Sequence, residues 1–94
     1  MGPPQVAIIE NQALVTVEVQ EAAERDPERP GFARIRVRVV AADPRDSWPN
    51  LFERDVGDCI DLFVPEARVH DFPPGARVQV VAKKTGLGTG FVLP

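Results

Sequence analysis

Several residue types with distinctive chemistry are scarce in this chain of 94 residues, which has no tyrosine, one cysteine (Cys59) and one histidine (His70). A single cysteine excludes an internal disulfide bond and any metal site built from several thiolates. A catalytic Cys–His pair would require these two residues to meet in the fold and to stabilise a thiolate. Since no other cluster of residues has the spacing of a catalytic or metal site, we expect a non-enzymatic protein with no cofactor and no metal.

Long apolar runs are also missing. No segment approaches the ~20 apolar residues of a membrane helix, and the N terminus lacks the basic flank of a signal peptide. With so few thiols, a reducing compartment is the natural setting for the chain. We therefore expect a cytoplasmic protein with no membrane partner.

An excess of positive charge is absent as well, because eleven Lys and Arg residues stand against fourteen Asp and Glu residues, for a net charge of −3. No overall field draws such a chain onto a polyanion. A role in nucleic-acid binding would have to rest on a local basic patch.

The strongest pattern that is present is a strict alternation of apolar and basic residues. From Ala33 to Val39 the odd positions are Ala, Ile, Val and Val, and the even positions are Arg34, Arg36 and Arg38. Side chains alternate between the two faces of a strand, so this segment predicts one apolar face and one face of three arginines. We call Arg34, Arg36 and Arg38 the arginine strip.

Other segments alternate in the same way and predict further strands. They cover residues 14–20, 59–64 and 77–84, with a short closing strand at 91–93. A chain of this length is expected to form one domain, residues 1–94, with a loose N-terminal arm at residues 1–5.

The segments between these strands predict loops and short turns. Residues 21–31 and 44–57 are charged and contain prolines, which forbid a long helix, although residues 22–25 could form one helical turn. Residues 66–72 could form one or two helical turns before Pro73 ends them.

Four strong strands, one short strand and no long helix predict an all-β domain. The Gly57-Asp58 pair before one strand and the Pro74-Gly75 pair before the next resemble turns of the OB-fold, a five-stranded Greek-key barrel, and the order of elements over residues 13–93 is similar. That resemblance implies a single small barrel with a ligand face on its second and third strands. An immunoglobulin-like β-sandwich is the alternative, although the chain is short by about two strands and lacks the paired cysteines.

The arginine strip has two interpretations. In the first, the arginines pair across the sheet with Glu18 on one neighbouring strand and Asp61 on the other. In the second, which the OB-fold resemblance implies, the strip follows the phosphates of single-stranded nucleic acid while Phe63 or Trp48 stacks on the bases. The residues implied for this nucleic-acid face are Arg34, Arg36, Arg38, Phe63 and Lys83.

The loop at residues 44–57 is unusually apolar for a connection, because it contains Trp48, Leu51 and Phe52. These side chains either cover one end of the core or form a contact surface, in which tryptophan is especially frequent. Our first hypothesis is that the protein binds a protein partner, or a second copy of itself, through these three residues or through an open strand edge.

Overall fold

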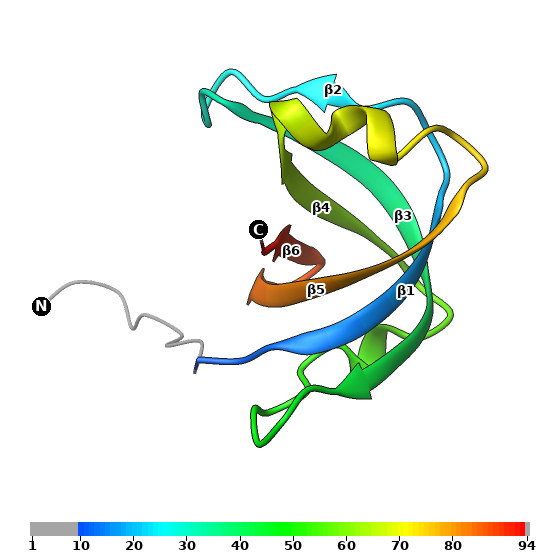
Figure 1. The fold of residues 1–94 in the computed structure, drawn as a ribbon, viewed down its shortest axis with the longest axis vertical. Coiled ribbons are helices and arrows are strands. Elements are labelled where there is room, and N and C mark those ends of the chain that lie inside the picture. Colours follow the sequence, from blue (N-terminus) through cyan, green and yellow to red (C-terminus); the bar gives the residue numbers. More distant parts are fainter. Residues whose placement is uncertain (1–9, 94) are drawn as a thin grey trace, which may run out of the picture.

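The structure is a computed structural model that describes residues 10–93, so the arm predicted at residues 1–5 lies outside the described residues. Between residues 10 and 93 the chain forms six strands and two short 3-10 helices (Figure 1). These elements are β1 (Ala13–Val19), β2 (Glu24–Arg25), β3 (Phe32–Pro44), η1 (Glu53–Asp55), β4 (Cys59–Pro65), η2 (Glu66–Asp71), β5 (Arg77–Gly86) and β6 (Thr89–Val92).

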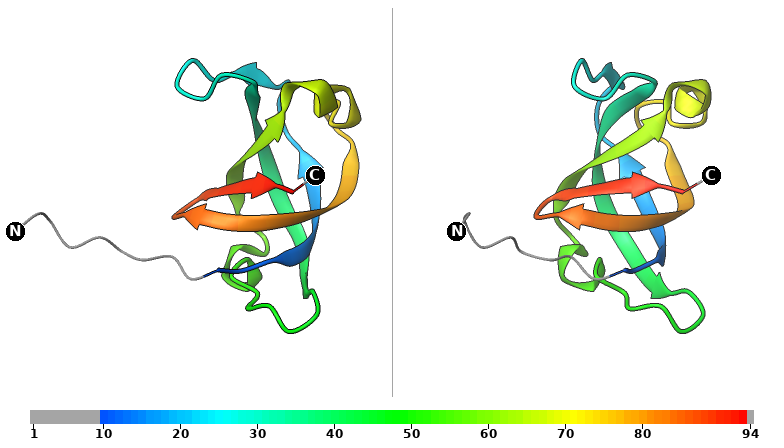
Figure 2. Two further views of the ribbon diagram at one scale, coloured as in Figure 1. Left: turned by 60° about the vertical axis from the view of Figure 1, so that its left-hand side comes forward. Right: turned by 90° about the vertical axis from the view of Figure 1, so that its left-hand side faces the viewer.

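Five of these strands close into a barrel. Antiparallel pairing joins β1 to both β3 and β5, β3 to β4, and β5 to β6. A short parallel pairing of residues 61–63 with residues 89–91 joins β4 to β6 and completes the ring (Figure 2). The all-β prediction is confirmed, and the order of pairing fits an OB-like barrel. The alternative of an immunoglobulin-like β-sandwich is wrong. Because β1 pairs with both β3 and β5, the strands form one closed ring and not two stacked sheets.

The alternation in the sequence determines which side chains fill the barrel. Ile35 and Val37 of β3 are fully buried, and Arg36 between them points outward. β3 is long enough to pair first with β4 and then with β1, and the register shifts by one residue beside Thr16 and Val17. A bulge of this kind bends a strand, which allows β3 to follow the curve of the barrel.

Two phenylalanines fill opposite ends of the barrel. Phe72 follows η2 at one end and Phe52 precedes η1 at the other, and both side chains are buried. Figure 1 shows η2 and the 44–57 loop at these two ends. Neither of the helices in residues 10–93 is long and apolar enough to cross a membrane.

One local prediction is wrong. Residues 22–25 do not form a helical turn, because Glu24 and Arg25 form β2 and pair with Arg34 and Ala33 of β3. The first residues of β3 extend beyond the end of β1, which would leave their backbone groups unpaired on that side, and β2 supplies the partners. The helical turns predicted at residues 66–72 are confirmed as η2.

Candidate functional site

The arginine strip lies on the outer face of β3 and forms ion pairs with carboxylates of the neighbouring strands. Arg36 pairs with Asp61 of β4 (Nη1–Oδ1 3.3 Å), and Arg38 pairs with Glu18 of β1 (Nη2–Oε2 3.4 Å). These are the two pairings predicted from the sequence. Exposed pairs of this kind contribute about 0.2–1 kcal/mol each, so they steady the sheet without holding the guanidinium groups firmly.

Glu18 binds a second arginine as well. Arg77 of β5 approaches the same carboxylate (Nη2–Oε2 3.4 Å), so Glu18 links β5, β1 and β3 on the outer surface. The hydrogen bond from Arg77 and the positive charge of Arg38 hold the pKa of Glu18 below its ordinary value. This carboxylate therefore stays ionised to a lower pH than a free glutamate.

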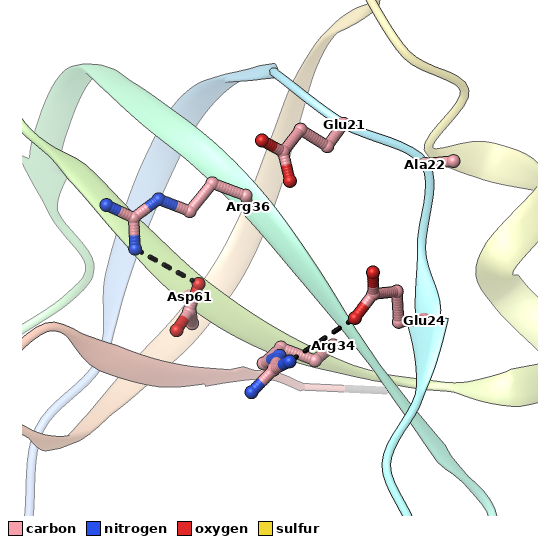
Figure 3. Close-up of a pocket in the computed structure, with 6 residues that line it drawn as sticks. All are labelled: Glu21, Ala22, Glu24, Arg34, Arg36 and Asp61. Carbon is pink, nitrogen blue, oxygen red and sulfur yellow. Dashed lines mark hydrogen bonds and ion pairs between the residues drawn. The ribbon is translucent and has the colours of Figure 1, made fainter.

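A pocket of about 280 Å³ opens beside the start of β3 (Figure 3). Arg34 lies at its edge and pairs with Glu24 of β2 (Nη2–Oε2 3.3 Å). Glu21 faces the pocket and forms no hydrogen bond or ion pair with any other residue that the structure describes. The pocket is lined by Glu21, Ala22, Glu24, Arg34, Arg36 and Asp61. Three carboxylates against two guanidinium groups make this pocket a poor place for a phosphate.

A second arrangement on the outer surface brings together part of the predicted nucleic-acid face. Three cross-strand pairings join these residues. Arg34 pairs with Phe63, Phe63 also pairs with Phe91, and Phe91 also pairs with Lys83. This cross-strand row, Arg34–Phe63–Phe91–Lys83, runs over β3, β4, β6 and β5, and at ~4.8 Å between strands it spans roughly 14 Å. Arg36 lies outside the row.

The ring of Phe63 is covered rather than open. Only 5% of this residue is exposed, because Phe91 packs against one side (ring centroids 4.9 Å apart) and Arg29 lies over the ring (Cζ to centroid 4.2 Å). In this conformation the Phe63 ring is therefore not open to the base that was predicted to stack on it. Arg29 comes from the turn between β2 and β3 and had no distinguishing feature in a charged, proline-rich segment.

Asp26 holds Arg29 in this position. Its carboxylate accepts a hydrogen bond from Arg29 (Nη1–Oδ2 3.0 Å) and another from the backbone N–H of Glu28 (2.9 Å). The backbone hydrogen bond, and then the guanidinium, lower the pKa of Asp26. The Arg29 side chain that covers Phe63 is thus held in place by a small hydrogen-bonded turn.

The three residues of the 44–57 loop that were predicted to contact a partner are divided between core and surface. Trp48 is 39% exposed, Leu51 is half-buried, and Phe52 is 0% exposed. The prediction that Phe52 contacts a partner is therefore wrong, because its side chain is part of the core. Of the three, Trp48 offers the largest apolar surface to another molecule.

Asn50 fixes the loop between Trp48 and Phe52. Its side-chain amide donates to the Ala42 carbonyl (3.1 Å), and its side-chain oxygen accepts from the backbone N–H of Phe52 (3.1 Å). The backbone N–H of Trp48 also donates to the Arg45 carbonyl (3.1 Å). Trp48 is therefore held on an ordered loop.

The residues considered for catalysis lie apart. Cys59 begins β4, whereas His70 is in η2, which follows the other end of that strand. Six residue steps along a strand correspond to roughly 20 Å, far beyond hydrogen-bond reach. In residues 10–93 no group of three or more His, Cys, Asp or Glu side chains could hold a metal ion.

Comparison with protein-family models, with curated proteins and with solved structures finds no match to this chain.

Proposed function

We propose that the protein is a non-enzymatic binding module with an OB-fold, and that it docks a protein partner through the 44–57 loop with Trp48 as the anchor. The order of strand pairing and the place of η2 between β4 and β5 support the OB-fold. The five strands of the closed barrel leave little open edge for a partner strand, and β2, which lies outside that ring, has only two residues. The loop is therefore the better docking surface.

The observation that carries this proposal is the partial exposure of Trp48 on a loop fixed at Asn50 and Phe52. Tryptophan is among the residues that contribute most to binding energy in protein interfaces. A loop that is already ordered loses little conformational entropy when a partner binds. Arg45 and Asp46 are exposed beside Trp48, so this surface carries both charges and suits a second copy of the same chain.

Self-association is the partner interaction that can be tested directly. Sedimentation velocity over a range of protein concentrations should show a dimer, and Trp48→Ala should remain monomeric under the same conditions. Leu87→Ser is the matched control, because Leu87 is a fully solvated apolar residue on a different turn. A wild-type protein that stays monomeric at millimolar concentration, with Trp48 fluorescence inaccessible to acrylamide, would leave the proposal without support.

A second candidate function is the binding of single-stranded nucleic acid, and the cross-strand row favours it. Two aromatic rings lie between two cationic residues, and Lys83 forms no ion pair with any other described residue. Single-stranded nucleic acid is bound by this combination of stacking rings and basic side chains. Titration of a labelled oligonucleotide at low salt tests it, and binding that is absent, or that Lys83→Glu and Arg36→Glu leave unchanged, would exclude it.

A further inference from the structure

Three phenylalanines form a cluster on the outside of the barrel, where side chains facing water are ordinarily polar. The ring of Phe91 packs edge-on against Phe32 (centroids 5.5 Å apart, planes at 78°) and in a tilted stack against Phe63 (4.9 Å, 33°). These rings come from β3, β6 and β4 and are separate from the core. They form a small apolar platform on the outer wall.

One side chain covers the Phe63 ring of this platform. Arg29 places its guanidinium 4.2 Å from the centre of the Phe63 ring. A guanidinium is planar and delocalised and stacks on aromatic faces as a planar ring does. Arg29 therefore occupies the position that a stacked planar group would take.

We infer that Arg29 is a displaceable cover on a stacking platform formed by Phe63 and Phe91, and that a base of single-stranded nucleic acid takes its place. This inference rests on the second candidate function, and it adds a closed and an open state to that site. The closed state is the one in the structure, with Arg29 held by Asp26. In the open state the base lies on Phe63, between Arg34 and Lys83 in the cross-strand row.

The strengths of the competing contacts favour displacement. The Arg29 side chain is 42% exposed, so a solvated cation makes both the contact with the covered Phe63 ring and the ion pair to Asp26, whose side chain is 11% exposed. Interactions of each kind shift an equilibrium by only about two- to fivefold. Stacking of one base on an aromatic side chain strengthens binding by roughly 5- to 150-fold. A base can therefore displace the guanidinium. The affinity for nucleic acid is then modestly lower than it would be if Arg29 did not cover the ring.

The test compares two variants that lose the same charge. Labelled oligothymidylate and an abasic strand of equal length are titrated at low salt with the wild type, Arg29→Ala and Arg45→Ala. We expect Arg29→Ala to bind oligothymidylate about three- to tenfold more tightly than the wild type, despite the lost positive charge, because the platform is already open. Arg45→Ala, which removes a cation from an exposed loop position, should bind equally or more weakly. On the abasic strand Arg29→Ala should gain nothing.

A second pair of variants keeps Arg29 and changes its anchor. Asp26→Asn and Glu28→Gln each remove one negative charge from the same turn, but only Asp26→Asn releases the guanidinium. Asp26→Asn should therefore bind oligothymidylate more tightly than Glu28→Gln does. If Arg29→Ala does not fold, this comparison tests whether Arg29 covers the platform.

The outcomes separate the two ideas. Measurable binding of oligothymidylate with no advantage of Arg29→Ala over Arg45→Ala, or the same advantage on the abasic strand, overturns the cover and leaves nucleic-acid binding standing. Absence of binding in every variant, including those with an open platform, overturns both.

Discussion

The ammonium of Lys84 lies 2.5 Å from the carboxylate of Asp55 (Nζ–Oδ2), and each side chain is only 14% exposed. The pair joins β5 to η1, which lies near the C-terminal end of the 44–57 loop that carries Trp48. Asn11 holds the same residue of β5, since it accepts from the Lys84 backbone N–H (2.7 Å) and donates to the Lys84 carbonyl (3.1 Å). The 44–57 loop is thus fastened to the barrel wall near its C-terminal end.

Removal of the ammonium should destabilise the protein. In Lys84→Met the Asp55 carboxylate remains mostly buried and loses its ion-pair partner, so we expect the free energy of unfolding to fall by about 1–3 kcal/mol, between the values for exposed and fully buried pairs. Urea denaturation measures this change. Lys83→Met, on the outward-facing neighbour, should change stability by less than about 0.5 kcal/mol.

The coupling between the two charges gives an independent check on that prediction. When Asp55→Asn is added to Lys84→Met, no unpaired charge remains, so the double variant should be more stable than the sum of the two single losses implies. Strictly additive losses would show that the two charges do not interact in solution.

A side chain at position 90, which is occupied by Gly90, should destabilise the protein. A Cβ at this position would lie 2.9 Å from Cζ of Phe52 and 3.0 Å from the carbonyl oxygen of Lys83. The backbone carbonyl belongs to the β5–β6 pairing and has little freedom to move, so Gly90→Ala should cost about 1–3 kcal/mol of stability. Gly86→Ala is the control, because its Cβ would meet only the side-chain oxygen of Thr89, which can rotate away. Equal melting temperatures for the two variants would contradict this account.

Phe52 and Trp48 should differ sharply in their effect on stability. Phe52 is fully buried, so Phe52→Ala removes a core ring and should cost about 3–5 kcal/mol, a large share of the ~5–15 kcal/mol available to a small domain. Trp48→Ala removes a partly exposed ring and should cost less than about 2 kcal/mol. Chemical denaturation of both variants provides the comparison, and a larger loss in Trp48→Ala would assign the indole to the core.

These two residues also show where prediction from the sequence ends. The strands were predictable because period-two alternation directly encodes an inner and an outer face, as in Ile35 and Arg36. A loop has no such period, so Trp48 and Phe52 could only be grouped together as apolar residues. Their separation depends on Asn50, whose two hydrogen bonds turn the chain so that one ring enters the barrel and the other does not.

The surface arrangements depended on pairings between distant segments. Asp61 and Glu18 could be assigned to Arg36 and Arg38 because the strands concerned are evident in the sequence. The neighbours of Phe63 could not be assigned from the sequence. Phe91 lies beside Phe63 because β4 and β6 pair in parallel, and Arg29 lies over the ring because of the turn between β2 and β3. Neither relationship leaves a periodic signal.

The position of Glu18 between Arg38 and Arg77 predicts a dependence of stability on pH. Because its pKa is lowered in the folded protein, the ionised carboxylate stabilises the fold above the ordinary glutamate pKa of about 4.3, and this contribution is lost as the pH falls through the lower folded value. Glu18→Gln should therefore be less stable than the wild type at pH 7, and the difference should shrink towards pH 2. Thermal melts between pH 7 and pH 2 measure it. Glu53→Gln is the control, because Glu53 is exposed and forms no ion pair with any described residue. Its stability should follow the wild-type curve throughout. A Glu18→Gln curve parallel to the wild-type curve would mean that the two arginines do not bind the Glu18 carboxylate in solution.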